Sequence, residues 1–250
     1  MKRDDLTAYL LEYLESAEFS DYGPNGLQVE GKPEVETIVT GVSASVELFE
    51  RAIELDADAV LVHHGLIWKG VQPLYRGGYR ERVRLLLAHD ITLYGFHLPL
   101  DAHPEIGNNA ILAGRLGLTD LEPFCLHQGR SIGFQGQTGG ISVDELTRRL
   151  TDVLDREPLV FPHGPENVRT VGIVTGGAQD NISDAVESGL DAYITGEVNE
   201  RTRAYAKEEG IHFFSAGHHA TEILGVQALG EHLADRFGLR VEYVDVPNPV

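Results

Sequence analysis

The sequence predicts an α/β protein of two related halves, with parallel or mixed sheets flanked by helices and a short inserted segment. Apolar runs rich in β-branched residues alternate with amphipathic segments, which is typical of βαβ units. The clearest unit joins a strand over 38–42 to a strand over 59–64 through a helix that Ser43 or Ser45 could cap. Polar residues follow several strands directly, where open α/β sheets form their sites.

An internal repeat indicates the two halves. The segment that starts at Ala185 aligns with the segment that starts at Ala52, at a constant offset of 133 residues. We therefore expect a first half over 1–124, an inserted segment or subdomain over 125–165 and a second half over 166–250, together forming one compact unit.

Local patterns predict the remaining elements. Helical spacing of apolar residues predicts helices over 4–16, 79–89, 110–116, 143–154, 182–188, 199–209 and 220–237. Apolar runs predict strands over 27–29, 91–95, 159–161, 171–174, 192–197, 211–214 and 241–246. Pro99 favours a loop after the strand over 91–95, and no strand is predicted over the glycine-rich stretch 133–140.

Composition excludes several classes of partner. A net charge of −19 gives no obvious electrostatic footprint for phosphate backbones or anionic lipid, so a nucleic-acid partner is disfavoured. No run of eighteen apolar residues occurs, which argues against a membrane span and a signal peptide. The single cysteine, Cys125, excludes an intrachain disulfide and fits a cytoplasmic protein with a buried, inert thiol. The abundance of acid over lysine suggests adaptation to a salty cytoplasm.

Two histidines end the strand over 59–64. His63 and His64 are adjacent, and neighbouring side chains of a regular strand point to opposite sides. Gly65 allows the chain to turn sharply after them. The pattern suggests half of a metal centre, with one imidazole aimed at each of two ions; the alternative is a pair of hydrogen-bonded surface histidines.

Two further pairs of metal-ligand type follow later strands. His97 precedes Asp101 by four residues, and His218 precedes Glu222 by four. The second pair falls on a predicted helix, so both side chains share one face, although His219 could replace His218. The other histidines are expected to be packed or solvated: His89, His103, His127, His163, His212 and His232.

Together these residues predict a dinuclear centre. Four imidazoles and two carboxylates exceed the needs of a closed structural zinc site, and they suit two bridged ions with open positions for water. Nitrogen ligands disfavour calcium and magnesium, which leaves zinc, iron, manganese, cobalt and nickel open.

Five motifs resemble the Nif-three-like family, whose members are called GTP cyclohydrolase I type 2 homologues. They are the runs Asn25 to Gly31, His63 to Gly70, His97 to Asp101, Ala192 to Glu197 and Gly217 to Glu222. The resemblance spans nearly the whole chain. It implies two metal ions held by His63, His64, Asp101, His218 and Glu222, with Glu222 as the bridge and His97 as a further ligand. It also implies a ring-shaped homohexamer.

Two functions compete at this stage. The first is a metal-dependent hydrolase in which Glu222 bridges the ions beside an activated water. Its small-molecule substrate would be a guanine nucleotide whose ring opens, another nucleotide, a phosphoester or an amide. The second is a non-catalytic metal-binding scaffold or regulatory protein, because no separate acid, base or nucleophile stands out beyond the ligands. Gly176 and Gly177 could offer amides to a phosphate or could simply form a turn.

Overall fold

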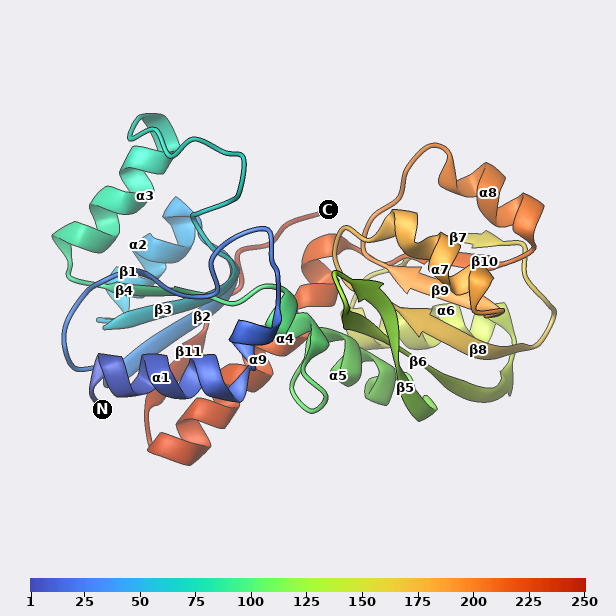
Figure 1. The fold of residues 1–250 in the computed structure, drawn as a ribbon, viewed down its shortest axis with the longest axis horizontal. Coiled ribbons are helices and arrows are strands. Elements are labelled where there is room, and N and C mark those ends of the chain that lie inside the picture. The colour runs from blue at the N-terminus through green and yellow to red at the C-terminus, as the bar shows by residue number, and fades with distance from the viewer. The chain divides into compact units, whose positions relative to one another are not determined.

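The computed structural model describes residues 1–250 and divides them into two compact units. Unit 1 comprises Met1–Leu100 and Gly225–Pro247, and unit 2 comprises Asp101–Leu224 and Asn248–Val250. Each unit has its own sheet flanked by helices, which confirms the predicted fold class (Figure 1). The halves proposed from the repeat have different bounds from these units and stay a prediction.

Unit 1 contains a five-stranded sheet in the order β1-β4-β3-β2-β11. The central strands are parallel and only β1 is antiparallel to its neighbour β4. The strand bounds are Gly26–Val29 for β1, Thr37–Ser43 for β2, Ala59–His64 for β3, Thr92–Gly95 for β4 and Arg240–Tyr243 for β11. The parallel arrangement brings the carboxyl ends of β3 and β4 to the same edge of the sheet.

Helices cover both faces of this sheet (Figure 1). One face carries α2 (Val46–Glu54) and α3 (Gly77–Ala88), and their apolar side chains form one core cluster with Val60 and Val62 of β3. The Ser45 hydroxyl caps α2, as predicted, by accepting the N–H of the third helical residue. The other face carries α1 (Arg3–Tyr13) and the C-terminal part of α9 (His218–Phe237).

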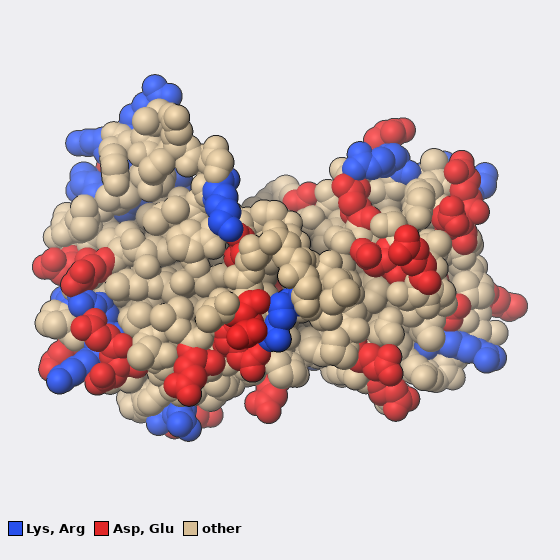
Figure 2. Space-filling model, in the orientation of Figure 1, with Lys and Arg blue, Asp and Glu red and all other residues tan.

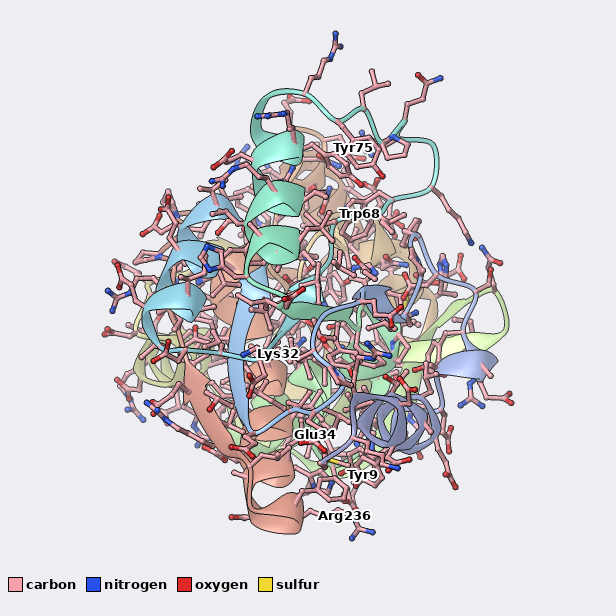
Figure 3. The ribbon with its side chains drawn as sticks, turned by 90° about the vertical axis from the view of Figure 1, so that its left-hand side faces the viewer. Tyr9, Lys32, Glu34, Trp68, Tyr75 and Arg236 are labelled. Carbon is pink, nitrogen blue, oxygen red and sulfur yellow. The ribbon has the colours of Figure 1, made fainter.

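The surface between α1 and α9 is aromatic. Arg236 of α9 lies over the ring of Tyr9 at 5.2 Å from its centroid (Figure 3). His232 stacks on Tyr13 with ring centroids 4.3 Å apart, so this histidine is packed, as expected, and lies outside the candidate site. These stacked contacts attach the helices to each other in unit 1.

Unit 2 contains a six-stranded sheet in the order β5-β6-β8-β9-β10-β7. Strands β8, β9 and β10 are parallel, and the remaining pairs are antiparallel. The strand bounds are Thr119–His127 for β5, Arg130–Ile141 for β6, Leu159–Pro162 for β7, Val168–Ile173 for β8, Ala192–Thr195 for β9 and His212–Ser215 for β10. The segment 125–165, predicted as an insertion, therefore supplies strands to this sheet.

The helices of unit 2 also lie on both faces of its sheet (Figure 1). They are α5 (Asn108–Arg115), α6 (Val143–Leu154), α7 (Ile182–Glu187) and α8 (Thr202–Glu209). Apolar residues of α5 and α6 form a core cluster with β8, β9 and β10. Cys125 on β5 is buried, and burial raises the pKa of its thiol to about 12, as expected of an inert cysteine.

The repeat is visible in the hydrogen bonds as well as in the sequence. Asp58 Oδ2 accepts the N–H groups of two consecutive residues at β2, the second of them Thr37 at 3.1 Å. Asp191, which stands 133 residues later, accepts the equivalent pair at β8, the second of them Thr170 at 3.0 Å. The same side chain therefore performs the same local task in both units.

One local prediction was wrong, and one strand was not predicted. The segment after β4 is not a loop but the short helix α4 (Leu98–Ala102), because Pro99 stands in the first turn, where its missing N–H has no helical acceptor. The glycine-rich stretch 133–140 belongs to β6, which pairs with β5 on one side and β8 on the other. Pairing on both sides stabilises a strand that its own residues favour only weakly.

Charged side chains of both signs lie on the face drawn in Figure 2. Acidic side chains are spread over both units, and basic side chains lie over α3 and at scattered positions elsewhere. None of the helices combines the length and the apolar character that a membrane span requires.

Candidate metal centre

Unit 1 brings three imidazoles together. His63 and His64 end β3, and His97 follows β4 on the neighbouring strand. One ligand nitrogen of each ring lies within 4.8 Å of the others, and the ring centroids are 4.8 to 5.6 Å apart. The alternative of a hydrogen-bonded surface pair does not fit His63, which is only 1% exposed, whereas His64 is partly exposed; both rings contact His97.

The hydrogen bonds of His63 and His97 show which nitrogen of each ring is left for an ion. His63 Nδ1 lies 3.0 Å from the carbonyl oxygen of Phe96, and His97 Nδ1 lies 2.7 Å from Asp21 Oδ1. Carbonyl and carboxylate oxygens only accept, so both Nδ1 atoms donate and Nε2 is the nitrogen left for an ion.

Asp21 is a site residue that the sequence did not reveal. The turn pattern around it predicted only a change of chain direction. Its side chain is 1% exposed. Burial raises the pKa of this carboxyl, but the hydrogen bonds from His97, Asn25 and the Tyr22 N–H outweigh burial and lower it. Asp21 is therefore a buried carboxylate in contact with a ligand-type histidine.

Unit 2 brings the two carboxylates and the fourth imidazole together. His218 and Glu222 stand at the start of α9, and His218 Nε2 lies 3.2 Å from Glu222 Oε1. Oxygens of Asp101 and Glu222 lie within 4.8 Å of one another. Glu222 is 2% exposed and Asp101 is 6% exposed. The predicted four-residue spacing on one helix face is confirmed for His218 and Glu222.

Glycine at position 176 makes room for Glu222. Gly176 has a φ of +70°, and a Cβ atom built on it would lie 2.2 Å from Glu222 Oε1. Its N–H donates to the hydroxyl of Thr221 at 3.1 Å. Of the two predicted roles for this glycine pair, the turn is therefore the one the structure shows at Gly176.

Glu197 is the second site residue that the sequence did not reveal. Its Oε1 lies 2.6 Å from His218 Nδ1. Burial lowers the pKa of His218, but Glu222 and Glu197 outweigh burial and raise it to about 9. A signal existed, because Glu197 stands 133 residues after His64, the offset of the repeat.

The other histidines lie outside these groups. The backbone N–H of His219 donates to the carbonyl oxygen of Val250, and it is His218 whose imidazole contacts Glu222. His212 is buried in β10 with Nε2 2.8 Å from the Pro165 carbonyl oxygen, as expected of a packed strand residue.

An aromatic ring borders the histidine group of unit 1. Trp68 lies on the connection between β3 and α3 (Figure 3), with its ring centroid 5.3 Å from that of His97 and 5.9 Å from that of His64. Its indole N–H donates to the Gly65 carbonyl oxygen. Lys69, next in the chain, is exposed. The indole is thus the large side chain that this connection places against the imidazoles.

A family model describes almost the entire chain. The model of Duf34/NIF3 (NGG1p interacting factor 3) matches residues 1–249. The chain belongs to the DUF34/NIF3 family. The match confirms the resemblance inferred from the five motifs.

Named DUF34/NIF3 relatives cover the chain end to end. The GTP cyclohydrolase 1 type 2 homolog of Pasteurella multocida is 50% identical over 98% of each chain, and that of Escherichia coli K12 is 49% identical over 100% of each. A solved structure described as protein ybgI, of unknown function, has a TM-score of 0.95 with 49% identity over the full length of both chains. The structure of TTHA1606 from Thermus thermophilus has a TM-score of 0.93 with 36% identity over the full length of both.

The ligand groups of this DUF34/NIF3 protein fit divalent metal ions. Unit 1 offers neutral nitrogen donors, and unit 2 offers carboxylate oxygens with one more imidazole. Such a mixed set suits zinc, iron, manganese, cobalt and nickel better than calcium or magnesium. The buried His, Asp and Glu clusters are therefore groups that could hold a metal.

Proposed function

We propose that this protein binds two divalent metal ions and uses them to hydrolyse a small molecule. The ions would be held by His63, His64, His97, Asp101, His218 and Glu222, with Glu222 as the bridging ligand. The observation that carries the proposal is the gathering of ligand-type side chains at strand ends in each unit, within 4.8 Å of one another. Buried ionisable groups gathered in this way are typical of functional sites.

The chemistry of a pair of bound ions is that of a hydrolase: such ions polarise a carbonyl or phosphoryl group and activate water. The imidazoles would fix the positions of the ions, and Glu222 would hold the spacing between them. The name of the relatives, GTP cyclohydrolase 1 type 2 homolog, suggests ring opening of a guanine nucleotide. A phosphoester or a cyclic amide would use the same arrangement.

The test is turnover by protein loaded separately with zinc, iron, manganese, cobalt and nickel. GTP, phosphoesters and cyclic amides would be supplied as substrates. We expect metal-dependent turnover that falls by at least about 100-fold in Glu222→Gln. Glu231→Gln, an exposed position on the same helix α9, is the matched control and should leave turnover unchanged. Loss of turnover in both variants, or turnover that survives removal of metal, would contradict the assignment.

A metal-binding scaffold or regulatory protein is the second candidate. It is favoured by one observation, namely that the nonligand carboxylates beside the histidines, Asp21 and Glu197, are each occupied by an imidazole Nδ1. Neither is placed as a separate general base. In this case tight metal binding would be measured with all five metals tested, and turnover would be absent with every substrate.

The proposal includes a ring-shaped homohexamer in the cytoplasm. The family resemblance supports the hexamer, and the single cysteine supports a reducing compartment. Light scattering on purified protein tests the assembly: a mass six times the 27.4 kDa of the chain is expected, and a monomer would contradict it.

A further inference from the structure

Asp21 accepts a complete set of hydrogen bonds. Its Oδ1 accepts from the Tyr22 N–H at 2.6 Å and from His97 Nδ1 at 2.7 Å. Its Oδ2 accepts from Asn25 Nδ2 and from the Leu98 N–H, each at 2.9 Å. An ionised carboxylate has acceptor positions for about four donors, so all of them are used.

This arrangement makes Nδ1 of His97 a hydrogen-bond donor. Two of the donors are backbone N–H groups and cannot be reversed. The amide of Asn25 is also oriented, because its Oδ1 accepts the backbone N–H of His97 at 2.8 Å. The carboxylate therefore accepts and His97 Nδ1 carries a hydrogen, so Nε2 is the nitrogen that can offer a lone pair to an ion.

Unit 2 contains the same arrangement around its own histidine. Glu197 Oε1 lies 2.6 Å from His218 Nδ1, and the opposite nitrogen, Nε2, faces Glu222 Oε1 at 3.2 Å. Each unit thus has one histidine with Nδ1 held by a carboxylate and Nε2 directed to the ligand group. The two carboxylates come from different parts of the chain: Asp21 from a turn before β1, and Glu197 from the segment directly after β9.

We propose that Asp21 and Glu197 are positioning residues, one in each unit, which hold His97 and His218 with Nδ1 as donor and present Nε2 to the metal ions. The inference rests on the proposed metal function. Carboxylates behind a ligating histidine orient its ring and raise the basicity of the ligating nitrogen, and their loss weakens metal binding by about 10- to 100-fold.

Asp21 positions a backbone group of α4 as well as the ring of His97. By accepting the Leu98 N–H it also holds the first residue of α4, the helix that carries Asp101. A purely structural helix cap would contribute to stability without setting the tautomer of His97. The two roles are therefore separated by measuring the tautomer and the metal affinity alongside stability.

The affinity experiment compares Asp21→Asn with Asp58→Asn. Asp58 is the matched control, because it too accepts two backbone N–H groups in unit 1 but contacts no histidine. Zn²⁺ affinity would be measured on the full chain by competition with a chromophoric chelator. We expect Asp21→Asn to bind Zn²⁺ about 10- to 100-fold more weakly and Asp58→Asn to stay within about twofold of the wild type. Equal affinities for Asp21→Asn and the wild type would overturn the inference.

A second variant avoids the risk that Asp21→Asn fails to fold. The Glu197 side chain is 36% exposed and stands after the last residue of β9, Thr195, so we expect its removal to leave the sheet of unit 2 intact. Glu197→Ala should weaken Zn²⁺ binding about tenfold, while the variant still unfolds in a single cooperative transition in urea. Unchanged affinity in Glu197→Ala would overturn the role of Glu197.

The tautomer itself is measured in the wild type without metal. Long-range ¹⁵N NMR correlations of histidine, assigned with His97→Asn, should show neutral His97 protonated on Nδ1. Protonation on Nε2 would overturn the inference. Absence of Zn²⁺ binding by the wild type would instead contradict the proposed function, while the tautomer would still decide the role of Asp21.

Discussion

The two units share a framework but differ in the side chains they place on it. Asp58 in unit 1 and Asp191 in unit 2 accept equivalent pairs of backbone N–H groups, at β2 and β8 respectively. At the end of α2, the Ala57 N–H donates to the Ala52 carbonyl oxygen at 3.0 Å. At the equivalent place in unit 2, after α7, the Leu190 N–H donates to the Ala185 carbonyl oxygen at 2.9 Å. The backbone route from strand to helix to strand is therefore the same in both.

The difference lies at the carboxyl ends of the strands. Where unit 1 has His64, unit 2 has Glu197, and where unit 1 has Ser43, unit 2 has Gly176. The ligand group of unit 1 consists of three imidazoles, whereas that of unit 2 combines carboxylates with one imidazole. The common backbone determines where these side chains lie. The type of ligand atom can then differ between the units, with imidazole nitrogen in one and carboxylate oxygen in the other.

A second difference is one connection. In unit 1, twelve residues separate β3 from α3, the segment from Gly65 to Arg76. The corresponding connection in unit 2 runs from Gly196 to Arg201 and is shorter. The longer connection carries the exposed apolar side chains of Val71, Leu74 and Tyr75 (Figure 3).

The largest difference between the two units is expected at the equivalent positions 43 and 176, when each residue is replaced by the one found in the other unit. Gly176→Ser should lower the free energy of unfolding by about 2–4 kcal/mol, because φ is positive and the new Cβ would displace Glu222. Ser43→Gly, the matched change in unit 1, should cost only about 1 kcal/mol. Urea unfolding measures both. Equal costs would show that the two positions are equivalent.

The one imidazole in the ligand group of unit 2, that of His218, should make stability depend on pH. The pKa of His218 is raised to about 9 in the folded state, above its ordinary value of 6.5. Its contribution, on the order of 1–3 kcal/mol, is therefore full below pH 6.5 and is lost as the pH rises through about 9. Urea midpoints of metal-free protein at about pH 6 and about pH 9.5 should show this loss. A loss of the same size in His218→Gln would assign it to other groups.

Removal of the two equivalent carboxylates, Asp58 and Asp191, should lower the free energy of unfolding by similar amounts. Asp58→Ala and Asp191→Ala each leave two backbone N–H groups without their acceptor, so each should cost about 1–2 kcal/mol. Chemical denaturation of both variants measures the costs. A difference above about 1 kcal/mol would mean that the two units depend on this bond to different extents, beyond the additional contact of Asp58 with Lys32.

Shortening the connection of unit 1 should have the smallest effect. Residues 69–78 are exposed, so replacing 70–75 with two glycines should change the free energy of unfolding by less than about 1 kcal/mol. Thermal unfolding measures the change. A larger loss would show that this connection belongs to the framework rather than being added to it.

Periodicity and the repeat predicted most of the elements and the ligand-type residues. The buried strand that ends at His63 and His64 is evident from its apolar run, and the i to i+4 spacing on a helix places His218 beside Glu222. The partners of the imidazoles could not be predicted, because Asp21 contacts His97 across 76 residues of chain. Such a contact depends on how the strands pair, which a local pattern does not contain.

The longer connection has an experimental consequence, because it carries the only tryptophan of the chain. The indole of Trp68 lies against two of the imidazoles that would hold metal. Its fluorescence is therefore a built-in optical reporter of this site, unobscured by any other indole. Titration with a quenching paramagnetic ion such as Co²⁺ or Ni²⁺ would follow occupancy directly, without a label.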